Sequence, residues 1–318
     1  MVTIVAGACT DASTTRSSDA IGRSSPAPTT APTTSATQGI CRGAHTETPD
    51  THRYATAAGA AANAQSLDVY ALERRGTCGP APIMVYVHGG GFRNGDKANA
   101  ITDKARWFNE KGWVFVSVNY RLIGDPEAGT DGAMYPRQPE DVAAAVDWLV
   151  EHAEDFGGDS EHITLMGHSA GAYLVALVGT DLDFLAAGNH DAARVRCVVV
   201  NDTESFRLAD NMAKSDMRSR VYRAAFGDDP DVWERASPIV HVGDTDVELL
   251  PRMLIVTRGS TARVDNNRTM VDTVNDAGGN AELLVADPYT HREVNQQVGR
   301  ADDRIVTPVL GDFLQGCD

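Results

Sequence analysis

Gly167-His168-Ser169-Ala170-Gly171 is the stretch of this 318-residue sequence that decides its fold. Largely apolar runs lie on both sides of it, at residues 162–166 and 172–178. The pattern predicts a short strand, a sharp turn that carries Ser169, and a helix. Small residues flank the serine because the strand and the helix approach closely there and the backbone of the serine is strained. The beginning of the helix also supplies free N–H groups and a partial positive charge, which suit a developing oxyanion.

A second glycine motif, His88-Gly89-Gly90-Gly91, directly follows an apolar run at residues 83–87. Glycines after a strand let bare backbone amides approach a reacting oxygen to about 3 Å, where side chains would obstruct them. We therefore expect the N–H groups of Gly90, Gly91 and Ala170 to form an oxyanion hole. His88 is expected to anchor this loop rather than to transfer protons.

The remaining patterns predict an α/β fold with a mostly parallel central sheet and helices on both faces. Apolar runs alternate with stretches of helical spacing, and the expected parallel strands cover residues 83–87, 113–118, 162–166, 195–200, 253–257 and 281–286. Two segments that alternate apolar and polar residues, 51–55 and 66–73, are expected as antiparallel edge strands. The domain is expected over residues 41–318, with residues 203–250 as a candidate cap insertion.

Residues 1–40 differ in composition from the rest of the sequence. The apolar and small residues before Cys9 are typical of the end of a signal peptide, and they resemble a bacterial lipoprotein cleavage site with Cys9 as the lipidated residue. Residues 10–38 are rich in Ser, Thr, Ala and Pro, which predicts a disordered tether. The sequence therefore predicts an exported protein, either secreted or held at the cell surface as a lipoprotein.

The composition argues against several kinds of partner. The net charge is −16, from 28 basic and 44 acidic residues spread along the chain, which disfavours nucleic acid and anionic membrane surfaces. The sequence has no run of 18 or more apolar residues, so membrane attachment is expected only through a lipid anchor at Cys9. No C-x-x-C or His/Cys cluster suggests a metal site, and no cofactor is expected. The oligomeric state stays open.

The five cysteines suit an oxidising compartment. If Cys9 is lipidated, four remain, and four cysteines allow three pairings. Cys41 and Cys78 enclose the first expected strands, so we expect these two to pair. Cys317 could instead join one of them, and Cys197, in an expected buried strand, is interpreted as a free core thiol.

The motifs resemble those of the α/β-hydrolase superfamily, and within it carboxylesterases of the hormone-sensitive-lipase and bacterial feruloyl and acetyl esterase type. The resemblance covers about residues 65–315 and depends on five landmarks: His88-Gly89-Gly90-Gly91, Asn119-Tyr120-Arg121-Leu122, the helix with Pro136, Asp141 and Trp148-Leu149, Phe156-Gly157-Gly158-Asp159, and Gly167-His168-Ser169-Ala170-Gly171. In this family a serine attacks an ester carbonyl, a histidine after the last strand is the base, and an acid from an earlier loop orients the histidine.

His291 is the histidine that fits the role of the base. It ends a turn at residues 287–291, after the last expected strand, and follows Ser and Asp in the chain order of the fold. Three aromatic residues, Phe92, Tyr173 and Phe206, are candidates for the wall of an acyl or alcohol pocket.

The triad acid departs from the family pattern, because Ala262 stands where the family has Asp. Asp202, at the end of the 195–200 strand, and Asp265, in the same loop as Ala262, are the two main candidates. Asp265 also fits the N-cap of the following helix. Asp287 is a third candidate, and a dyad without an acid is the remaining alternative.

These observations together predict an exported serine carboxylesterase that acts on a small-molecule or polymer-linked ester. The acyl-enzyme would form on Ser169, with His291 as general base. The nucleophile and oxyanion motifs do not separate esters from amides, so an amide-directed hydrolase, such as a peptidase or an arylformamidase, is a second hypothesis. The third is a catalytically impaired binding module, which Ala262 favours and the pair Ser169 and His291 opposes.

Overall fold

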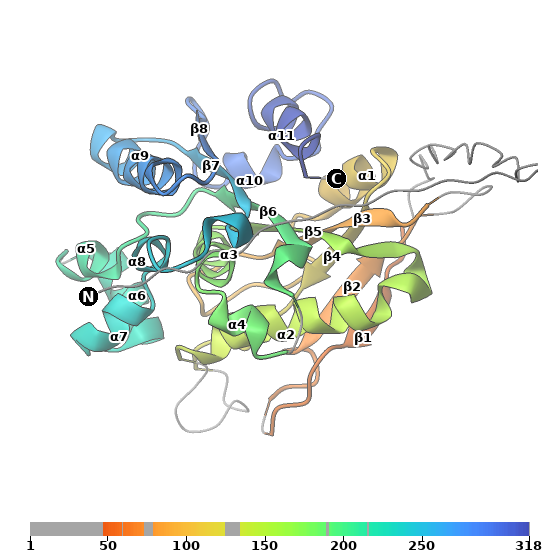
Figure 1. Cartoon of the computed structure of the whole chain (residues 1–318), viewed down its shortest axis with the longest axis horizontal. Helices are drawn as coiled ribbons and strands as arrows, with labels where there is room; N and C mark the ends of the chain where they lie inside the picture. The colour runs from red at the N-terminus through yellow and green to blue at the C-terminus, as the bar shows by residue number, and fades with distance from the viewer. Residues whose placement is uncertain are drawn as a thin grey trace, which may run out of the picture. The chain divides into compact units, whose positions relative to one another are not determined.

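Eight strands of the described chain form one sheet in the order β1-β2-β4-β3-β5-β6-β7-β8 (Figure 1). The computed structural model describes residues 47–58, 60–72, 79–124, 134–188, 191–214 and 216–317, which lie in one compact unit, residues 38–318. The strands are β1 (Asp50–Arg53), β2 (Ser66–Tyr70), β3 (Ala81–Val87), β4 (Val114–Val118), β5 (Gly158–His168), β6 (Val195–Asn201), β7 (Arg252–Thr257) and β8 (Ala281–Val285).

The pairing of the strands confirms the expected mixed sheet. β1 and β2 run antiparallel to their neighbours at one edge, whereas all pairs from β4 to β8 are parallel. Parallel neighbours need crossover connections, and helices supply them between most of the strands. The helices are α1 (Thr102–Glu110), α2 (Arg137–His152), α3 (Ala170–Thr180), α4 (Asp183–Ala186), α5 (Leu208–Met212), α6 (Met217–Phe226), α7 (Pro230–Arg235), α8 (Pro238–His241), α9 (Thr261–Asp276), α10 (Glu293–Gln296) and α11 (Val306–Leu314), with short 3₁₀ turns η1 (Ala153–Phe156), η2 (Ala192–Arg194) and η3 (Val247–Leu249).

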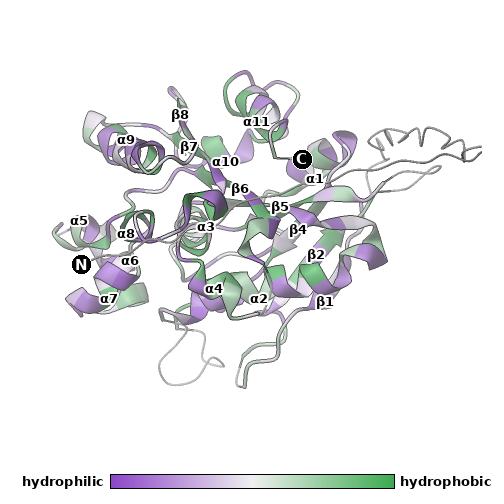
Figure 2. Ribbon diagram, viewed as in Figure 1, coloured by the Kyte–Doolittle hydropathy of each residue, from purple (hydrophilic) through white to green (hydrophobic). Residues whose placement is uncertain are grey.

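Two apolar clusters, one on each face of the sheet, form the core. Successive residues of a strand point to opposite faces, so Ile83, Val85 and Val87 of β3 join the cluster that contains α2 and α3. Met84 and Tyr86 of the same strand join the cluster with α1 and α11. Figure 2 shows hydrophobic residues along the central strands and mixed colours on outer helices such as α9. This arrangement explains why the central strands are continuous apolar runs in the sequence.

The segment between β6 and β7, where the candidate cap was expected, is mostly helical. It holds α5 to α8, which lie together in Figure 1. Tyr173 of α3 joins this segment to the sheet, because its hydroxyl donates to the backbone carbonyl of Ala236 at 2.6 Å. The ring of Tyr173 also packs edge-on against Tyr222 and Phe226 of α6. The segment is therefore anchored directly on the helix that follows Ser169.

The structure pairs two cysteines that the sequence interpretation did not join. Cys197 forms a disulfide with Cys317, across 120 positions of the sequence and with a Cα–Cα distance of 5.8 Å. The interpretation of Cys197 as a free thiol is wrong, and so is the pairing of Cys317 with Cys41 or Cys78. Cys197 lies on the face of β6 that packs against α11, and the chain returns to that face directly after α11.

Several predictions fall outside the described residues: the lipidation of Cys9, the tether at residues 10–38 and the pairing of Cys41 with Cys78. Within the described ranges, no helix is both long and apolar enough to cross a membrane. In the same part of the chain, no group of three or more His, Cys, Asp or Glu side chains is arranged to hold a metal ion.

Candidate active site

Ser169 lies in the sharp turn between β5 and α3 and has an unfavourable backbone conformation. Its φ and ψ angles are 56° and −114°, a region that costs a non-glycine residue free energy and is typical of a nucleophile turn. The flanking glycines allow the turn. A Cβ at Gly167 would lie 2.2 Å from the carbonyl oxygen of Gly171, and a Cβ at Gly171 would lie 2.1 Å from that of Val87.

His291 lies beyond β8 and contacts Ser169, as the sequence predicted. The Ser169 hydroxyl donates to His291 Nε2 at 2.9 Å. On the other side of the ring, His291 Nδ1 donates to Asp202 Oδ2 at 2.7 Å. Ser169, His291 and Asp202 therefore form a continuous chain of hydrogen bonds, although 122 and 89 positions of the sequence separate the two pairs.

Asp202 is the carboxylate that the structure places against His291. It directly follows β6, has a positive φ of 66°, and its side chain is completely buried. Its backbone N–H donates to the carbonyl of Val256 in β7 at 2.8 Å. This bond ties the turn after β6 to the neighbouring strand, so the carboxylate has a fixed position beside the imidazole.

Two arginines that the sequence reasoning missed also bind the Asp202 carboxylate. Arg258 Nε donates to Oδ2 at 2.8 Å, and Arg263 Nη2 donates to Oδ1 at 2.5 Å. Arg263 is additionally paired with Glu204. Burial of Asp202 raises its pKa, but the hydrogen bond from His291 and the charges of the two arginines outweigh burial and hold the pKa below its ordinary value.

The other acid candidates lie away from the imidazole. Asp265 is an exposed residue within α9. It does not cap that helix, because Ser260 is the N-cap and accepts from the Arg263 N–H, so the N-cap interpretation of Asp265 is wrong. The Asp287 carboxylate accepts from the Gly259 N–H at 3.3 Å. Ala262, at the position where the family has an acid, is exposed on α9 and is directly followed by Arg263.

The segment that carries His291 is fastened to the sheet by polar side chains. His168, Asn201 and Lys104 donate hydrogen bonds of 2.9, 3.0 and 2.7 Å to backbone carbonyls in residues 291–295. Two causes lower the pKa of His168 to about 3: burial, which is the larger, and the charge of the nearby His291. The ring of His168 is therefore neutral, and its Nε2–H is the donor. Burial lowers the pKa of Lys104 to about 7. His168, the residue before Ser169, thus helps to fix the position of His291.

The glycine loop after β3 lies against the nucleophile turn. A Cβ at Gly89 would lie 2.8 Å from the carbonyl oxygen of His168 and 3.0 Å from Ser169 Cβ. Among the residues that the structure describes, the N–H groups of Gly90, Gly91 and Ala170 have no hydrogen-bond acceptor. Unpaired amides beside a serine hydroxyl are the property required of an oxyanion hole.

His88 anchors this loop, in agreement with the sequence interpretation. Its ring stacks on Tyr120 with centroids 4.6 Å apart, and Nδ1 contacts the carbonyl of Gly89 at 2.8 Å. The Tyr120 hydroxyl donates to the His88 carbonyl at 3.0 Å. Burial lowers the pKa of His88, which keeps the ring neutral in its structural position.

A cavity of about 330 Å³, here called the serine cavity, opens beside Ser169 and His291. Gly91 and Phe92 form one wall, and Val221 and Tyr222 of α6 form another. Of the three aromatic candidates, Phe92 therefore lines the cavity. Tyr173 and Phe206 do not belong to its wall and are buried in the core behind it.

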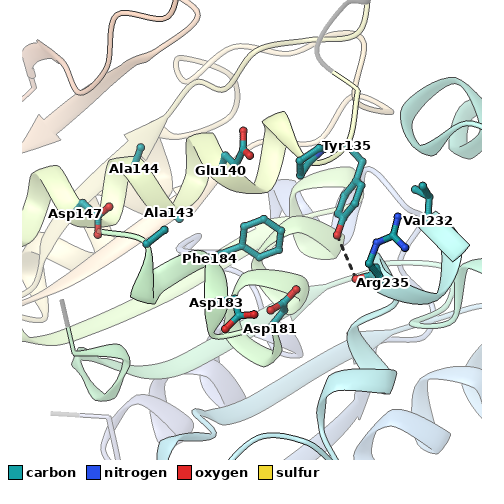
Figure 3. Close-up of a pocket in the computed structure, with 12 residues that line it drawn as sticks. Tyr135, Glu140, Ala143, Ala144, Asp147, Asp181, Asp183, Phe184, Val232 and Arg235 are labelled. Atoms are coloured by element: carbon teal, nitrogen blue, oxygen red, sulfur yellow. Dashed lines mark hydrogen bonds between the residues drawn. The ribbon is translucent and has the colours of Figure 1, made fainter. Parts of the chain in front are cut away.

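A second cavity of about 630 Å³ lies between α2, α4 and α7 and contains neither Ser169 nor His291. Figure 3 shows the side chains that surround it: Tyr135, Glu140, Asp147, Asp181, Asp183, Phe184, Val232 and Arg235. We call it the acidic cavity. Its largest aromatic residues, Tyr135 and Phe184, pack edge-to-face with centroids 6.4 Å apart.

Comparison with known proteins identifies the family. The BD-FAE family model matches residues 67–268, which includes both glycine motifs and Asp202. The chain belongs to the BD-FAE family. The esterase LipQ of Mycobacterium tuberculosis is 29% identical over 244 residues, which is 74% of this chain and 55% of LipQ. Lipase 2 of a Moraxella species is 35% identical over 131 residues, 40% of this chain and 28% of that enzyme. The chain thus spans about half the length of LipQ and a smaller share of Lipase 2.

Solved structures share the fold of this BD-FAE member. The match to a truncated carbohydrate esterase from gut microbiota covers 86% of this chain and 98% of the esterase chain, with a TM-score of 0.66 and 20% identity. The match to esterase 2 of Thermogutta terrifontis covers 84% of this chain and 92% of the esterase chain, with a TM-score of 0.64 and 20% identity. The expected α/β-hydrolase fold is confirmed by these likenesses.

Proposed function

We propose that this BD-FAE protein is a serine ester hydrolase in which Ser169, His291 and Asp202 form the catalytic triad. The observation that carries the proposal is the unbroken chain of hydrogen bonds from the Ser169 hydroxyl through His291 to Asp202, at the wall of a cavity. This arrangement activates a hydroxyl as a nucleophile at neutral pH.

In the first half of the reaction, Ser169 Oγ attacks the acyl carbonyl carbon while its proton moves to His291 Nε2. The carbonyl oxygen becomes an oxyanion, and the N–H groups of Gly90, Gly91 and Ala170 stabilise it. When the tetrahedral intermediate collapses, the bond to the alcohol oxygen breaks and His291 returns the proton to that oxygen. The products of this half are the free alcohol and an acyl group bound to Ser169.

In the second half, a water molecule replaces the alcohol. His291 takes a proton from the water as its oxygen attacks the acyl carbonyl, and a second oxyanion forms in the same place. As this intermediate collapses, the bond between the acyl carbon and Ser169 Oγ breaks and His291 returns its proton to Oγ, which releases the carboxylic acid and restores the Ser169 hydroxyl. The same three groups therefore serve both halves without a metal or a cofactor in the scheme.

The role of Asp202 is to hold the imidazole and to stabilise its charged form. The lowered pKa of Asp202 keeps the carboxylate ionised throughout the reaction, and it is not the final acceptor of the proton. Its two arginine partners compete with the imidazolium for the same negative charge. The arginines therefore strengthen the position of Asp202 and weaken its electrostatic support of His291.

Export is part of the proposal. The disulfide between Cys197 and Cys317 supports an oxidising compartment, and the signal-like and tether-like segments before residue 41 agree with export as a secreted protein or a lipoprotein. Mass spectrometry of the protein recovered from the culture medium and from the membrane fraction of the native host would distinguish the two. Recovery from the cytoplasm alone would contradict export.

The activity is tested with p-nitrophenyl propionate and butyrate, since the related Thermogutta esterase 2 has been solved with propionate and butyrate bound. We expect the wild-type protein to release p-nitrophenol and Ser169→Ala to lose at least 10⁴-fold in kcat. Ser260→Ala, a change at an exposed serine on the N-cap of α9, is the matched control and should retain activity. Equal rates for wild type and Ser169→Ala would overturn the proposal.

Two further measurements separate the rival functions. A diethyl phosphoryl ester inhibitor should add one phosphoryl group, and peptide mass spectrometry should locate it on Ser169 because the hydroxyl is activated. The matching p-nitroanilides test the amide-directed alternative, and we expect them to react far more slowly than the esters. A preference for the anilides would favour an amidase, and no labelling with no turnover would favour a binding module.

A further inference from the structure

Arg258 lies in the wall of the serine cavity, together with Ser169 and His291. Its Nε donates to Asp202 Oδ2, the same oxygen that accepts from His291 Nδ1. Both contacts are shorter than 3 Å, so the guanidinium is a near neighbour of the catalytic imidazole. The Arg258 side chain is 22% exposed, whereas Arg263, the other partner of Asp202, is only 8% exposed and is not part of the wall.

The donor groups at the end of Arg258 have no protein acceptor. Among the residues that the structure describes, neither Nη nitrogen of Arg258 has a hydrogen-bond partner. The other carboxylate of the cavity, Glu204, is bound by Arg263. Once Nε is occupied by Asp202, the two Nη groups still present a fork of N–H donors, and that fork matches a carboxylate in a bidentate geometry.

The remaining wall of the serine cavity supplies no competing cation among the described residues. Phe92, Val221 and Tyr222 contribute apolar surface to the same cavity. A substrate with an apolar spacer between its ester carbonyl and an acidic group would place the spacer on this surface. Its acidic group would then meet the guanidinium, a few atoms from the point of attack.

We propose that Arg258 selects ester substrates that carry a carboxylate or a comparable anionic group a few atoms from the ester carbonyl. This inference depends on the ester hydrolase function proposed above and names the substrate class for it. Arg258 then has two contacts with different purposes: Nε positions Asp202, and the Nη groups bind the substrate. The partly shielded site strengthens this charge-assisted contact relative to water.

The test compares esters that differ only in charge. The monoethyl esters of succinate, glutarate and adipate are paired with the corresponding ethyl ester carboxamides, which have nearly the same shape without the charge. Ethanol release gives kcat/KM for each, and the quantity of interest is the ratio of the acid to its amide. We expect a ratio of about 10 or more for at least one chain length in the wild-type protein, because charged hydrogen bonds are about twice as strong as neutral ones.

Arg258→Gln should reduce the ratio to about 1. Arg263→Lys is the matched control, since it loses the guanidinium fork at Asp202, keeps a cation beside Glu204, and changes a residue that is not part of the wall of the serine cavity. It should lower kcat for acid and amide alike and preserve the ratio. If Arg258→Gln does not fold, Arg258→Lys is the second variant, because it keeps the charge and loses the fork, and it should give an intermediate ratio. In the wild-type protein, the ratio should also fall several-fold when the salt concentration is raised from a low value to 0.5 M.

Three outcomes would overturn the inference: a wild-type ratio near or below 1 at every chain length, an unchanged ratio in Arg258→Gln, or an equal loss of the ratio in Arg263→Lys. Each of them can occur while the neutral ethyl esters are still hydrolysed. Failure to hydrolyse any ester, charged or neutral, would instead contradict the function proposed in the previous subsection. The two proposals therefore fail in distinguishable ways.

Discussion

The serine cavity and the acidic cavity differ in how their carboxylates are held. The acidic cavity is the larger, at about 630 Å³ against about 330 Å³, yet its carboxylates do not connect to a nucleophile. Burial raises the pKa of Asp181 in that cavity, and the charge of His241, 3.6 Å away, offsets this only in part. In the serine cavity, Asp202 is more deeply buried and has a lowered pKa, because His291 and two arginines converge on it.

The number of cations around a carboxylate, rather than the size of the cavity, distinguishes the candidate active site from the acidic cavity. A carboxylate whose burial is only partly offset by nearby cations has a raised pKa. A buried acid with three cationic or hydrogen-bonding partners stays ionised and can orient an imidazole. The following predictions test this difference, beginning with the largest expected effect.

Removing the charge of Asp202 should affect activity far more than removing the charge of Asp181. We expect Asp202→Asn to lower kcat about 10³- to 10⁴-fold, since the wrong imidazole tautomer becomes favoured, as in serine proteases. Asp181→Asn should change kcat less than twofold. Steady-state kinetics with a p-nitrophenyl ester measures both, and circular dichroism confirms folding. A comparable loss in both variants, or a retained rate in Asp202→Asn, would break the comparison.

The close contact between the glycine loop and the nucleophile turn should be the next most sensitive feature. In Gly89→Ala the new methyl group meets the His168 carbonyl at 2.8 Å, so the loop has to move away from Ser169. We expect kcat to fall about 10²-fold, the effect of displacing an oxyanion donor. Gly243→Ala, where nothing lies within 4 Å of the new Cβ, is the control. If Gly89→Ala is as active as Gly243→Ala, the loop does not serve as the oxyanion hole.

The pH dependence of stability should reveal the neutral His168 behind the serine cavity. Its pKa in the folded protein is about 3, below its unfolded value of about 6.5. The unfolded state therefore binds more protons between these values, and the stabilisation present above pH 6.5 is lost as the pH falls. The slope is about 1.4 kcal/mol per pH unit in this range. Urea unfolding at pH 4 to 7 should show a smaller loss in His168→Gln than in wild type, and parallel curves would contradict the prediction.

The smallest expected effect concerns two valines on neighbouring helices. Val221 of α6 lines the serine cavity, and Val232 of α7 lines the acidic cavity. Val221→Ala removes part of the apolar wall and should raise KM for a butyrate ester about threefold, with little change in kcat. Val232→Ala should leave both constants within experimental error. A rise in KM for Val232→Ala of the same size would indicate that the acidic cavity also contacts substrate.

The sequence was sufficient for the parts of the site that local patterns encode. Ser169 and the glycine loop belong to short motifs whose backbone geometry depends on neighbouring residues. His291 follows from its place after the last strand, and the central strands follow from continuous apolar runs, because both of their faces are buried.

The parts that the sequence left open depend on contacts between distant segments. Asp202 and Asp265 had similar local support, and the choice between them required knowing which loop reaches the imidazole. Arg258 and Arg263 were missed, although both lie close in the sequence to Ala262, where the family has an acid. The pairing of Cys197 with Cys317 was missed because it depends on which face of the sheet the chain reaches after α11, and that face is the one to which Cys197 of β6 points.

The disulfide between Cys197 and Cys317 also makes a covalent ring of the chain. Asp202, α6 and His291 lie within the ring, and Ser169 lies outside it. A protease that cuts once inside the ring, for example at the exposed turn of Gly243 and Asp244, separates no part of the catalytic machinery from the rest. Such a nicked molecule would run as two fragments on a reducing gel and as one without reductant. The link thus gives the molecule tolerance to backbone cleavage, which would be useful to the exported protein proposed above.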